Sequence, residues 1–267
     1  MKADGTVNRS ALPTIFNPED LNALEEALKI KDEFGAEIIV LTMGPPNASN
    51  VLRKSLFRGA DDVILLSDIK FSAADTLATS YALSLAIKKI GNFDLIIGGT
   101  QAIDGDTAQV GPQTAEKLKI NQLTFIDKIV KLTKNEIIVN RTTDFGYETV
   151  KAKLPILLTI TGEANTPRPY SVKQTLTYKN AISLIEKHDY DDGYLESDND
   201  DKPFIITNWN HEDINADVES CGLSGSPTQV KKIENVVLEA GNYKEIENSE
   251  DGLKMLISEL MSEHIIG

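Results

Sequence analysis

The residues best placed to do chemistry lie in one polar stretch that follows a short apolar run. Phe93 to Ile97 is apolar and is closed by Gly98 and Gly99, which is typical of a buried parallel strand. From Thr107 onward the apolar spacing becomes helical. A ligand beyond the carboxyl end of such a strand meets the free N–H groups of a helix N-terminus, which favour phosphate. The stretch therefore predicts a nucleotide site.

This stretch is not a P-loop, because no Gly-Lys-Ser/Thr closes it. Asp104 and Asp106 stand where a phosphate loop usually avoids negative charge, so we interpret them as turn formers or as partners of ribose or ring N–H groups. The phosphates then fall to backbone N–H groups and to the uncharged Thr107 and Gln109. Composition alone allows equally a capped helix with Asx turns and no ligand.

The segment Ala102–Pro112 closely resembles the flavin and adenine-nucleotide loop in the beta subunit of electron transfer flavoproteins. It is most similar to the branch that carries out flavin-based electron bifurcation. Four other stretches extend the resemblance over nearly the whole chain, in the family's order: Asn17–Asp20, Thr42–Pro46, Gly59–Asp61 and Gly222–Thr228.

The resemblance implies an FAD on this chain, with its ring near the interface with an alpha subunit that holds a second FAD. NADH would deliver a hydride to the first FAD. One electron would go to ferredoxin and one, through the alpha-subunit FAD, to a partner flavin dehydrogenase of the acyl-CoA or 2-hydroxy-acid type. No side chain must act as an acid or base. The implied cofactor-binding residues are Asn17, Thr42, Gly44, Pro45, Asp75, Thr76, Ala102, Asp104, Asp106, Thr107, Gln109, Val110 and Gly111.

Among these residues, Gly44, Pro45, Asp75 and Thr76 are assigned to NADH. Asn17, Asp104, Thr107, Gln109, Val110 and Gly111 are assigned to FAD. Two alternatives stay open. One is a non-bifurcating flavoprotein with AMP in place of this FAD, although that branch usually has a more acidic, Cys- or Asn-containing loop at residues 105–108. The other is an adenine-nucleotide-binding regulatory module without redox function.

Composition limits the remaining possibilities. The 267 residues are 41% hydrophobic, which is enough for a core, and no apolar run approaches the ~20 residues that span a bilayer. The net charge of −14 argues against nucleic acid or an anionic membrane as partner. A single cysteine, Cys221, suits a reducing cytoplasm and a buried structural role. The three histidines lack metal-ligand spacing, so we expect no metal site.

Apolar spacing predicts the elements that position the loop. Strands are expected at 37–43, 63–66, 93–97 and 155–161, and helices at 18–34, 47–58, 72–90 and 171–186. In the last helix Val172, Thr175, Leu176, Ala181 and Ile182 are expected to face inward. Regular alternation of strand and helix predicts a Rossmann-like parallel sheet with helices on both faces. Period-two spacing over 126–153 predicts an appended antiparallel ribbon.

Residues 162–171 correspond to the family's recognition loop, which touches the partner dehydrogenase. Asn165, Pro167, Arg168 and Tyr170 are the implied partner-binding residues, although Pro169 separates an Arg-Tyr pair that is usually consecutive. We expect an α/β domain over residues 1–188 and a C-terminal arm over 189–267 that packs on the partner subunit. The arm starts with an acidic run at 189–201. Because family members usually begin with a strand before the hairpin read at 1–13, we also expect an apolar strand upstream of Met1.

Overall fold

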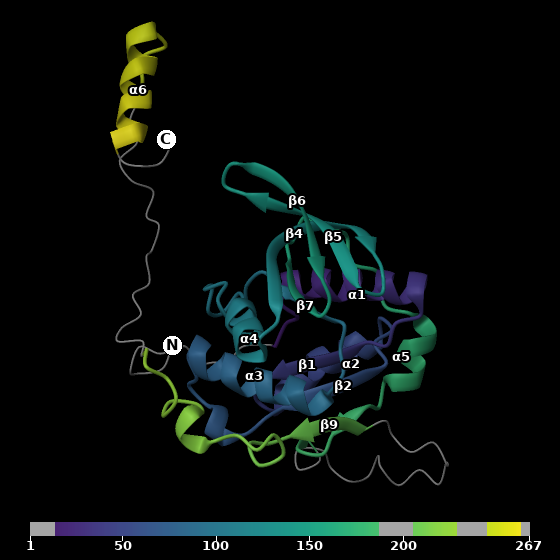
Figure 1. Cartoon of the computed structure of the whole chain (residues 1–267). Coiled ribbons are helices and arrows are strands. Elements are labelled where there is room, and N and C mark those ends of the chain that lie inside the picture. Colours follow the sequence, from purple (N-terminus) through teal and green to yellow (C-terminus); the bar gives the residue numbers. More distant parts are fainter. Residues whose placement is uncertain (1–13, 187–204, 229–244, 263–267) are drawn as a thin grey trace. The chain divides into compact units, whose positions relative to one another are not determined.

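The computed structural model describes residues 14–186, 205–228 and 245–262 of the chain. Its contacts divide the chain into two units: one covers Arg9–Gln229, and the other joins Met1–Asn8 to Val230–Gly267. The second unit contributes helix α6 (Glu250–Ser262) to the described residues. The other helices and strands named below belong to the first unit (Figure 1). The acidic run at 189–201 and the hairpin expected at 1–13 lie outside the described residues.

A four-stranded sheet forms one half of the α/β unit. Its strand order is β1-β2-β9-β8, and each neighbouring pair is parallel. Val63 to Leu66 in β2 are buried, as expected for a central parallel strand. The four strands are β1 (Ile39–Met43), β2 (Asp62–Leu66), β8 (Ile182–Ser183) and β9 (Ile205–Trp209).

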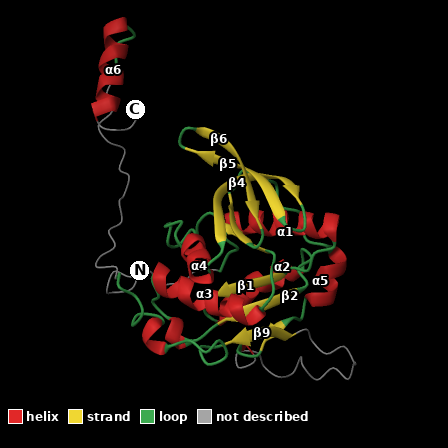
Figure 2. Cartoon of the chain, in the orientation of Figure 1, coloured by secondary structure: helices red, strands yellow, loops and turns green. Residues whose placement is uncertain are grey.

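A five-stranded sheet, in the order β3-β7-β4-β5-β6, carries the polar loop (Figure 2). Strands β3, β7 and the first part of β4 are parallel, and β4, β5 and β6 continue as an antiparallel ribbon. The predicted ribbon at 126–153 is therefore confirmed. The five strands are β3 (Leu95–Gly99), β4 (Asn121–Leu132), β5 (Glu136–Thr143), β6 (Gly146–Lys153) and β7 (Ile156–Ile160).

Helices lie on both sides of the sheets, which confirms the predicted α/β class. Helix α1 contacts β3 and β7, while α3 and α4 pack against each other. The α-helices of this unit are α1 (Pro18–Phe34), α2 (Ser49–Leu56), α3 (Thr76–Ile90), α4 (Val110–Leu118) and α5 (Val172–Tyr178). Short 3-10 turns occupy Pro46–Ala48, Ile69–Phe71 and Val218–Ser220. No helix among the described residues is long and apolar enough to cross a membrane.

The helix predicted at 171–186 is shorter than expected. Helix α5 ends at Tyr178, and Ile182 enters strand β8, where it pairs with Ile205. Val172 and Leu176, predicted to face inward, are 76% and 64% exposed, whereas Ala181 is buried. Pairing with β9 ends the helix, because a strand contact distant in sequence overrides a local helical spacing.

Residues 205–228, which we expected in the arm, belong to the α/β unit. Strand β9 pairs with β2, and Cys221 packs with Leu66 and Phe71 in a buried cluster. Burial raises the pKa of the Cys221 thiol, and the charges of Asp217 and Asp68 act in the same direction. The thiol is therefore an unreactive core group, as the sequence predicted.

Within the described residues, strands β1 and β3 each form one edge of their sheet. Each has one strand neighbour among the described residues: β2 for β1 and β7 for β3. Both are only partly buried, while β7 is fully buried. Both strands run parallel to their neighbours, so their carboxyl ends lie at the same edges as those of β2 and β7.

Candidate functional site

The polar loop joins the carboxyl end of β3 to α4 and lies against the first turn of α1. Gly99 allows this approach, because a Cβ on it would stand 2.7 Å from the main-chain nitrogen of Asp20. Such a distance is a steric clash, so only glycine fits here. The end of β3 and the beginning of α1 are therefore in direct contact.

Three side chains from the start of α1 hold the loop. Asp20 Oδ1 accepts a hydrogen bond from the Gly99 N–H at 2.7 Å, and Glu19 Oε2 accepts one from the Gln101 N–H at 2.8 Å. Asn17 uses both ends of its amide: Nδ2 donates to Gln101 O at 2.9 Å, and Oδ1 accepts from Ile103 N–H at 3.2 Å. Asn17 occupies the N-cap position of α1, but its side chain does not cap the helix.

The Asp20 carboxylate is held mainly by neighbours within the loop and the helix. Desolvation by the surrounding chain raises the pKa of Asp20, and the hydrogen bonds from Gly99 and Asn17 oppose that rise. Asp20 is exposed at the surface, so these two donors act alongside water in solvating the carboxylate.

The middle of the loop has a constrained backbone. The Asp106 N–H donates to Ala102 O at 2.8 Å, closing a turn around Asp104. Asp106 and Ala108 have φ values of 50° and 52°. The left-handed conformation costs a residue with a Cβ roughly 1–2 kcal/mol. Backbone strain of this kind persists where the surrounding structure enforces it.

Helix α4 begins directly after this strained turn and has free donors at its N-terminus. Among the described residues, no protein acceptor contacts the N–H groups of Val110 or Gly111. The first turn contains no acidic side chain, and Gln109 provides no side-chain cap. Gly111 also packs closely on β7, because a Cβ there would stand 3.0 Å from Thr159 Cγ2. These groups fit an anion.

Helix α3 contributes a second set of contacts to the loop. Thr76 Oγ1 donates to Gln109 Oε1 at 3.1 Å and accepts from Gln113 Nε2 at 3.2 Å. Ser80 Oγ donates to Gln113 Oε1 at 3.2 Å. The structure thus brings Thr76 and Gln109, two predicted site residues from different elements, into contact.

Asp75 serves as the N-cap of α3 and as a clamp on a distant loop. Its carboxylate accepts from the N–H groups of Leu77 and Ala78, and from the N–H and hydroxyl of Thr228. Desolvation raises the pKa of Asp75, but these hydrogen bonds, led by the Thr228 hydroxyl, outweigh it and lower the pKa below its ordinary value. A carboxylate with four donors has little capacity left for a ribose.

Thr42, Gly44 and Pro45 lie at the carboxyl end of β1, in the other sheet. Gly44 N–H donates to Leu66 O at 3.1 Å, and Pro45 O accepts from Ala48 N–H at 2.9 Å. Among the described residues, no hydrogen bond links these three positions to the loop after β3. They form a separate group from the residues that α1 and α3 hold together.

The predicted recognition loop is anchored on α1. Asn165 and Asn22 exchange hydrogen bonds of 2.7–3.1 Å, and Arg168 binds Glu25 at 2.9–3.1 Å and Asp32 at 2.8 Å. The hydrogen bonds to Glu25, together with the one to Asp32, raise the pKa of the Arg168 guanidinium further. Pro167 lies within this pinned stretch.

Beyond Arg168 the loop and α5 present apolar groups. The Tyr170 ring meets Phe57 edge-on at 5.7 Å between centroids and lies 4.2 Å from the Arg58 guanidinium carbon. Val172 and Leu176 follow on the exposed side of α5. Sequence reasoning missed these two residues as surface groups. Their i, i+4 spacing is compatible with an inward or an outward stripe, so spacing alone could not decide.

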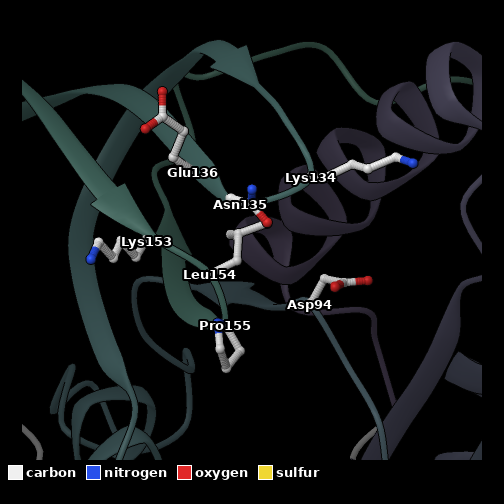
Figure 3. Close-up of a pocket in the computed structure, with 7 residues that line it drawn as sticks. All are labelled: Asp94, Lys134, Asn135, Glu136, Lys153, Leu154 and Pro155. Atoms are coloured by element: carbon white, nitrogen blue, oxygen red, sulfur yellow. The ribbon is translucent and has the colours of Figure 1, made fainter.

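Two hollows in the described surface lie away from the loop after β3. A pocket of about 490 Å³ lies at the amino end of β3, between the turn before β5 and the turn after β6 (Figure 3). Its lining residues are Asp94, Lys134, Asn135, Glu136, Lys153, Leu154 and Pro155. Ligands of open α/β sheets bind at the carboxyl ends of strands, so this position does not favour a nucleotide. Within the described residues, no acidic, His or Cys cluster could hold a metal ion.

The fold and the loop define an α/β protein with a candidate nucleotide-binding edge. Residues 4–187 match the electron transfer flavoprotein domain. The chain is 47% identical over 227 residues to the caffeyl-CoA reductase-Etf complex subunit CarD of Acetobacterium woodii, covering 85% of this chain and 78% of the relative. The chain belongs to the electron transfer flavoprotein family.

Two other relatives align with nearly all of this chain. The electron transfer flavoprotein subunit beta of Clostridium acetobutylicum is 38% identical, over 98% of this chain and 92% of the relative. The acryloyl-CoA reductase electron transfer subunit gamma of Anaerotignum propionicum is 36% identical, with the same coverage of both chains. The relatives are thus electron-transfer subunits, two of them of reductase complexes, and the predicted resemblance to the beta subunit is confirmed.

Proposed function

We propose that this chain is the beta subunit of a heterodimeric, cytoplasmic electron transfer flavoprotein and binds FAD at the loop after β3. The observation that carries the proposal is the uncapped N-terminus of α4. It follows a loop that the side chains at the start of α1 hold in place. The N–H groups of Val110 and Gly111 would hold the pyrophosphate, with Thr107 and Gln109 as uncharged partners. Ala102, Asp104 and Asp106 would line the side facing ribose and ring.

The flavin would supply the redox chemistry, since it accepts a hydride and releases single electrons. The residues of this chain would bind it, orient it and restrict access to it. No side chain at the loop is needed to move a proton. Asn17, which we expected to be a cofactor ligand, already uses both ends of its amide on the loop.

We further propose that NADH delivers a hydride to this FAD and that the complex splits the two electrons. One electron would go to ferredoxin, and the other, through an FAD on the alpha subunit, to a partner flavin dehydrogenase. The carboxyl end of β1, at Thr42, Gly44 and Pro45, is the proposed nicotinamide side, because it is a second strand exit of the kind at which α/β sheets bind ligands. Asp75 and Thr76 would border it, Asp75 through the helix that it caps rather than through its carboxylate.

The alternative within the family is AMP at the loop after β3 and a single FAD on the alpha subunit. The cofactor content of the heterodimer separates the two. We expect two FAD per heterodimer, bleaching by NADH, and ferredoxin reduction only when the acceptor of the dehydrogenase is also present. One FAD with one AMP, and no bleaching, would establish the non-bifurcating alternative. Adenine nucleotide without any flavin would indicate a regulatory module.

The partner dehydrogenase would dock on the recognition loop and on the exposed side of α5. Tyr170, Val172 and Leu176 are exposed apolar side chains that follow a loop held in place by α1. Asn165, Pro167 and Arg168 would hold the recognition loop in position for docking rather than insert into a pocket on the partner. Helix α6 would pack on the alpha subunit, because Leu253, Ile257 and Met261 are about half exposed.

A further inference from the structure

We propose that Glu19 and Asp20 are positioning residues that hold the nucleotide loop in its binding conformation through main-chain N–H groups. The inference rests on the proposed nucleotide site, and it concerns residues that would not touch the nucleotide themselves. It also assigns the same positioning role to Asn17.

The first observation is that some main-chain N–H groups of the loop are already hydrogen-bonded, while others are not. The N–H groups of Gly99, Gln101 and Ile103 are already bound by Asp20, Glu19 and Asn17, respectively. These three donors are therefore withdrawn from any phosphate. The N–H groups of Val110 and Gly111 have no protein acceptor among the described residues. The first half of the loop, residues 99–103, is thus held by α1, whereas the second half leads into α4 and leaves N–H groups free for a ligand.

The second observation is that α1 itself is firmly placed. The helix contacts β3 and β7. Its side chains Asn22 and Glu25 also bind the recognition loop, which follows β7. The first turn of α1 can therefore define the position of the loop. Every second N–H over residues 99–103 donates to a side chain at the start of this fixed helix.

The third observation is the close approach at Gly99. A Cβ at this residue would stand 2.7 Å from Glu19 C and 2.8 Å from Glu19 Cβ. Any side chain here would push the loop away from α1 and break the two carboxylate contacts. Gly99→Ala therefore tests the same contact from the loop side, without altering either carboxylate.

The strained turn explains why the loop needs holding. Asp106 and Ala108 both have positive φ values, a conformation that is unfavourable for alanine and is better tolerated by aspartate. If residues 99–103 are released, residues 104–108 can relax to lower-energy conformations, and the donors of α4 then lose their fixed relation to Thr107 and Gln109. Affinity for the nucleotide would fall while the overall fold remains.

The test uses the full chain purified with its partner subunit, with FAD and AMP as probes. Glu19→Ala and Asp20→Ala should each lower the affinity for the preferred nucleotide by about tenfold or more, the scale expected for a lost hydrogen bond to a charged group. Glu19→Gln and Asp20→Asn keep an acceptor oxygen and should recover most of the affinity. Glu33→Ala is the matched control, because Glu33 is exposed in the last turn of the same helix.

Amide hydrogen exchange gives a readout that does not depend on the nucleotide. Gly99 and Gln101 should be protected in the wild type, and each alanine variant should lose protection at its own partner. Three results would overturn the inference: rapid exchange of both amides in the wild type, alanine variants that bind as tightly as wild type, or amide variants that bind as weakly as the alanine variants. The last result would make the two carboxylates direct ligands.

The outcomes also separate this inference from the proposed function. A wild-type complex that binds neither FAD nor AMP on this subunit would overturn the proposed function. Protection of the Gly99 and Gln101 amides would then show, without any nucleotide, whether Glu19 and Asp20 hold the loop. If the wild type binds a nucleotide and the alanine variants bind it equally well, the positioning role of Glu19 and Asp20 is overturned and the proposed function stands.

Discussion

Arg168 and Glu25 are joined by both the side chain and the main chain of the arginine. The guanidinium contacts both carboxylate oxygens at 2.9–3.1 Å, and the Arg168 N–H donates to Glu25 Oε2 at 3.0 Å. Glu25 is nearly buried, with a side-chain exposure of 7%. Glu25 thus binds both the main chain and the side chain of Arg168 in the recognition loop. Removing the arginine would leave a buried carboxylate charge without its partner, which lowers stability.

Replacing Arg168 should loosen the recognition loop. Arg168→Ala leaves a nearly buried carboxylate with one main-chain donor, so we expect a loss of roughly 1.5–3 kcal/mol in the free energy of unfolding. Arg168→Lys keeps the charge but not the bidentate geometry, and should recover only part of this loss. Chemical denaturation measures the change, with Lys173→Ala as control. Equal stability of wild type and Arg168→Ala would contradict the contact.

Replacing Val172 and Leu176 should separate docking from stability. Because both side chains are largely exposed, the double alanine variant should unfold within about 0.5 kcal/mol of wild type. Its affinity for the partner dehydrogenase should nevertheless fall at least tenfold. Binding to the immobilised heterodimer measures this effect. Phe145→Ala, at a fully exposed hairpin tip, is the control, and unchanged binding of the double variant would exclude α5 from the interface.

Replacing Thr107 and Gln109 should weaken nucleotide retention. The double alanine variant removes the two proposed uncharged partners of the phosphates and also the contact between Gln109 and Thr76. Each lost hydrogen bond to a charged group costs roughly 1.5–3 kcal/mol, enough to lower occupancy on dilution. The nucleotide content after dialysis is the measurement. A content equal to wild type would assign these residues a structural role only.

The Asp75 clamp should contribute to the pH dependence of stability. The folded-state pKa of Asp75 is lowered, so its contribution is complete above the unfolded pKa of about 3.9 and is lost as the pH falls through the folded value. We therefore expect the stability difference between wild type and Asp75→Asn to be largest near neutral pH and to shrink below about pH 4. Unfolding curves between pH 7 and about pH 2.5 test this. A difference that grows in acid would reverse the assigned sign.

The left-handed residue Ala108 offers a test of the strained turn. Ala108→Gly removes the steric cost of the positive φ and should leave the protein equally stable or up to about 1 kcal/mol more stable. Ala108→Val adds β-branching in the same conformation and should destabilise by roughly 1–2 kcal/mol or more. Thermal unfolding compares the pair. Similar midpoints for Gly and Val would mean that residue 108 leaves this conformation at little cost.

The sequence could predict the elements whose spacing is local. Residues 18–34 and the ribbon at 126–153 follow from apolar periodicity and turn residues, and both appear as expected. The early end of α5 at Tyr178 could not be predicted, because the chain just beyond it pairs, from Ile182, with a strand more than twenty residues away. Long-range pairing leaves no local pattern in either partner.

The candidate site was predictable in position and not in the roles of its residues. The glycines and polar residues after β3 identify the loop, but the side chains that hold it come from α1, about eighty residues earlier. Asn17 and Asp75 have residue types typical of ligands, yet their polar atoms are used by main-chain groups and by Thr228. Which donor a carboxylate or amide meets depends on tertiary packing.

The edge strands β1 and β3 have a consequence for handling the isolated chain. The sequences of β1 (Ile-Val-Leu-Thr-Met) and β3 (Leu-Ile-Ile-Gly-Gly) contain no charge and no proline. Edge strands without such gatekeepers expose ready-made templates on which other chains can add strands. Expression without a partner subunit should therefore favour aggregation, and a single lysine at the partly exposed Ile39 is the first substitution to try for keeping the chain dispersed.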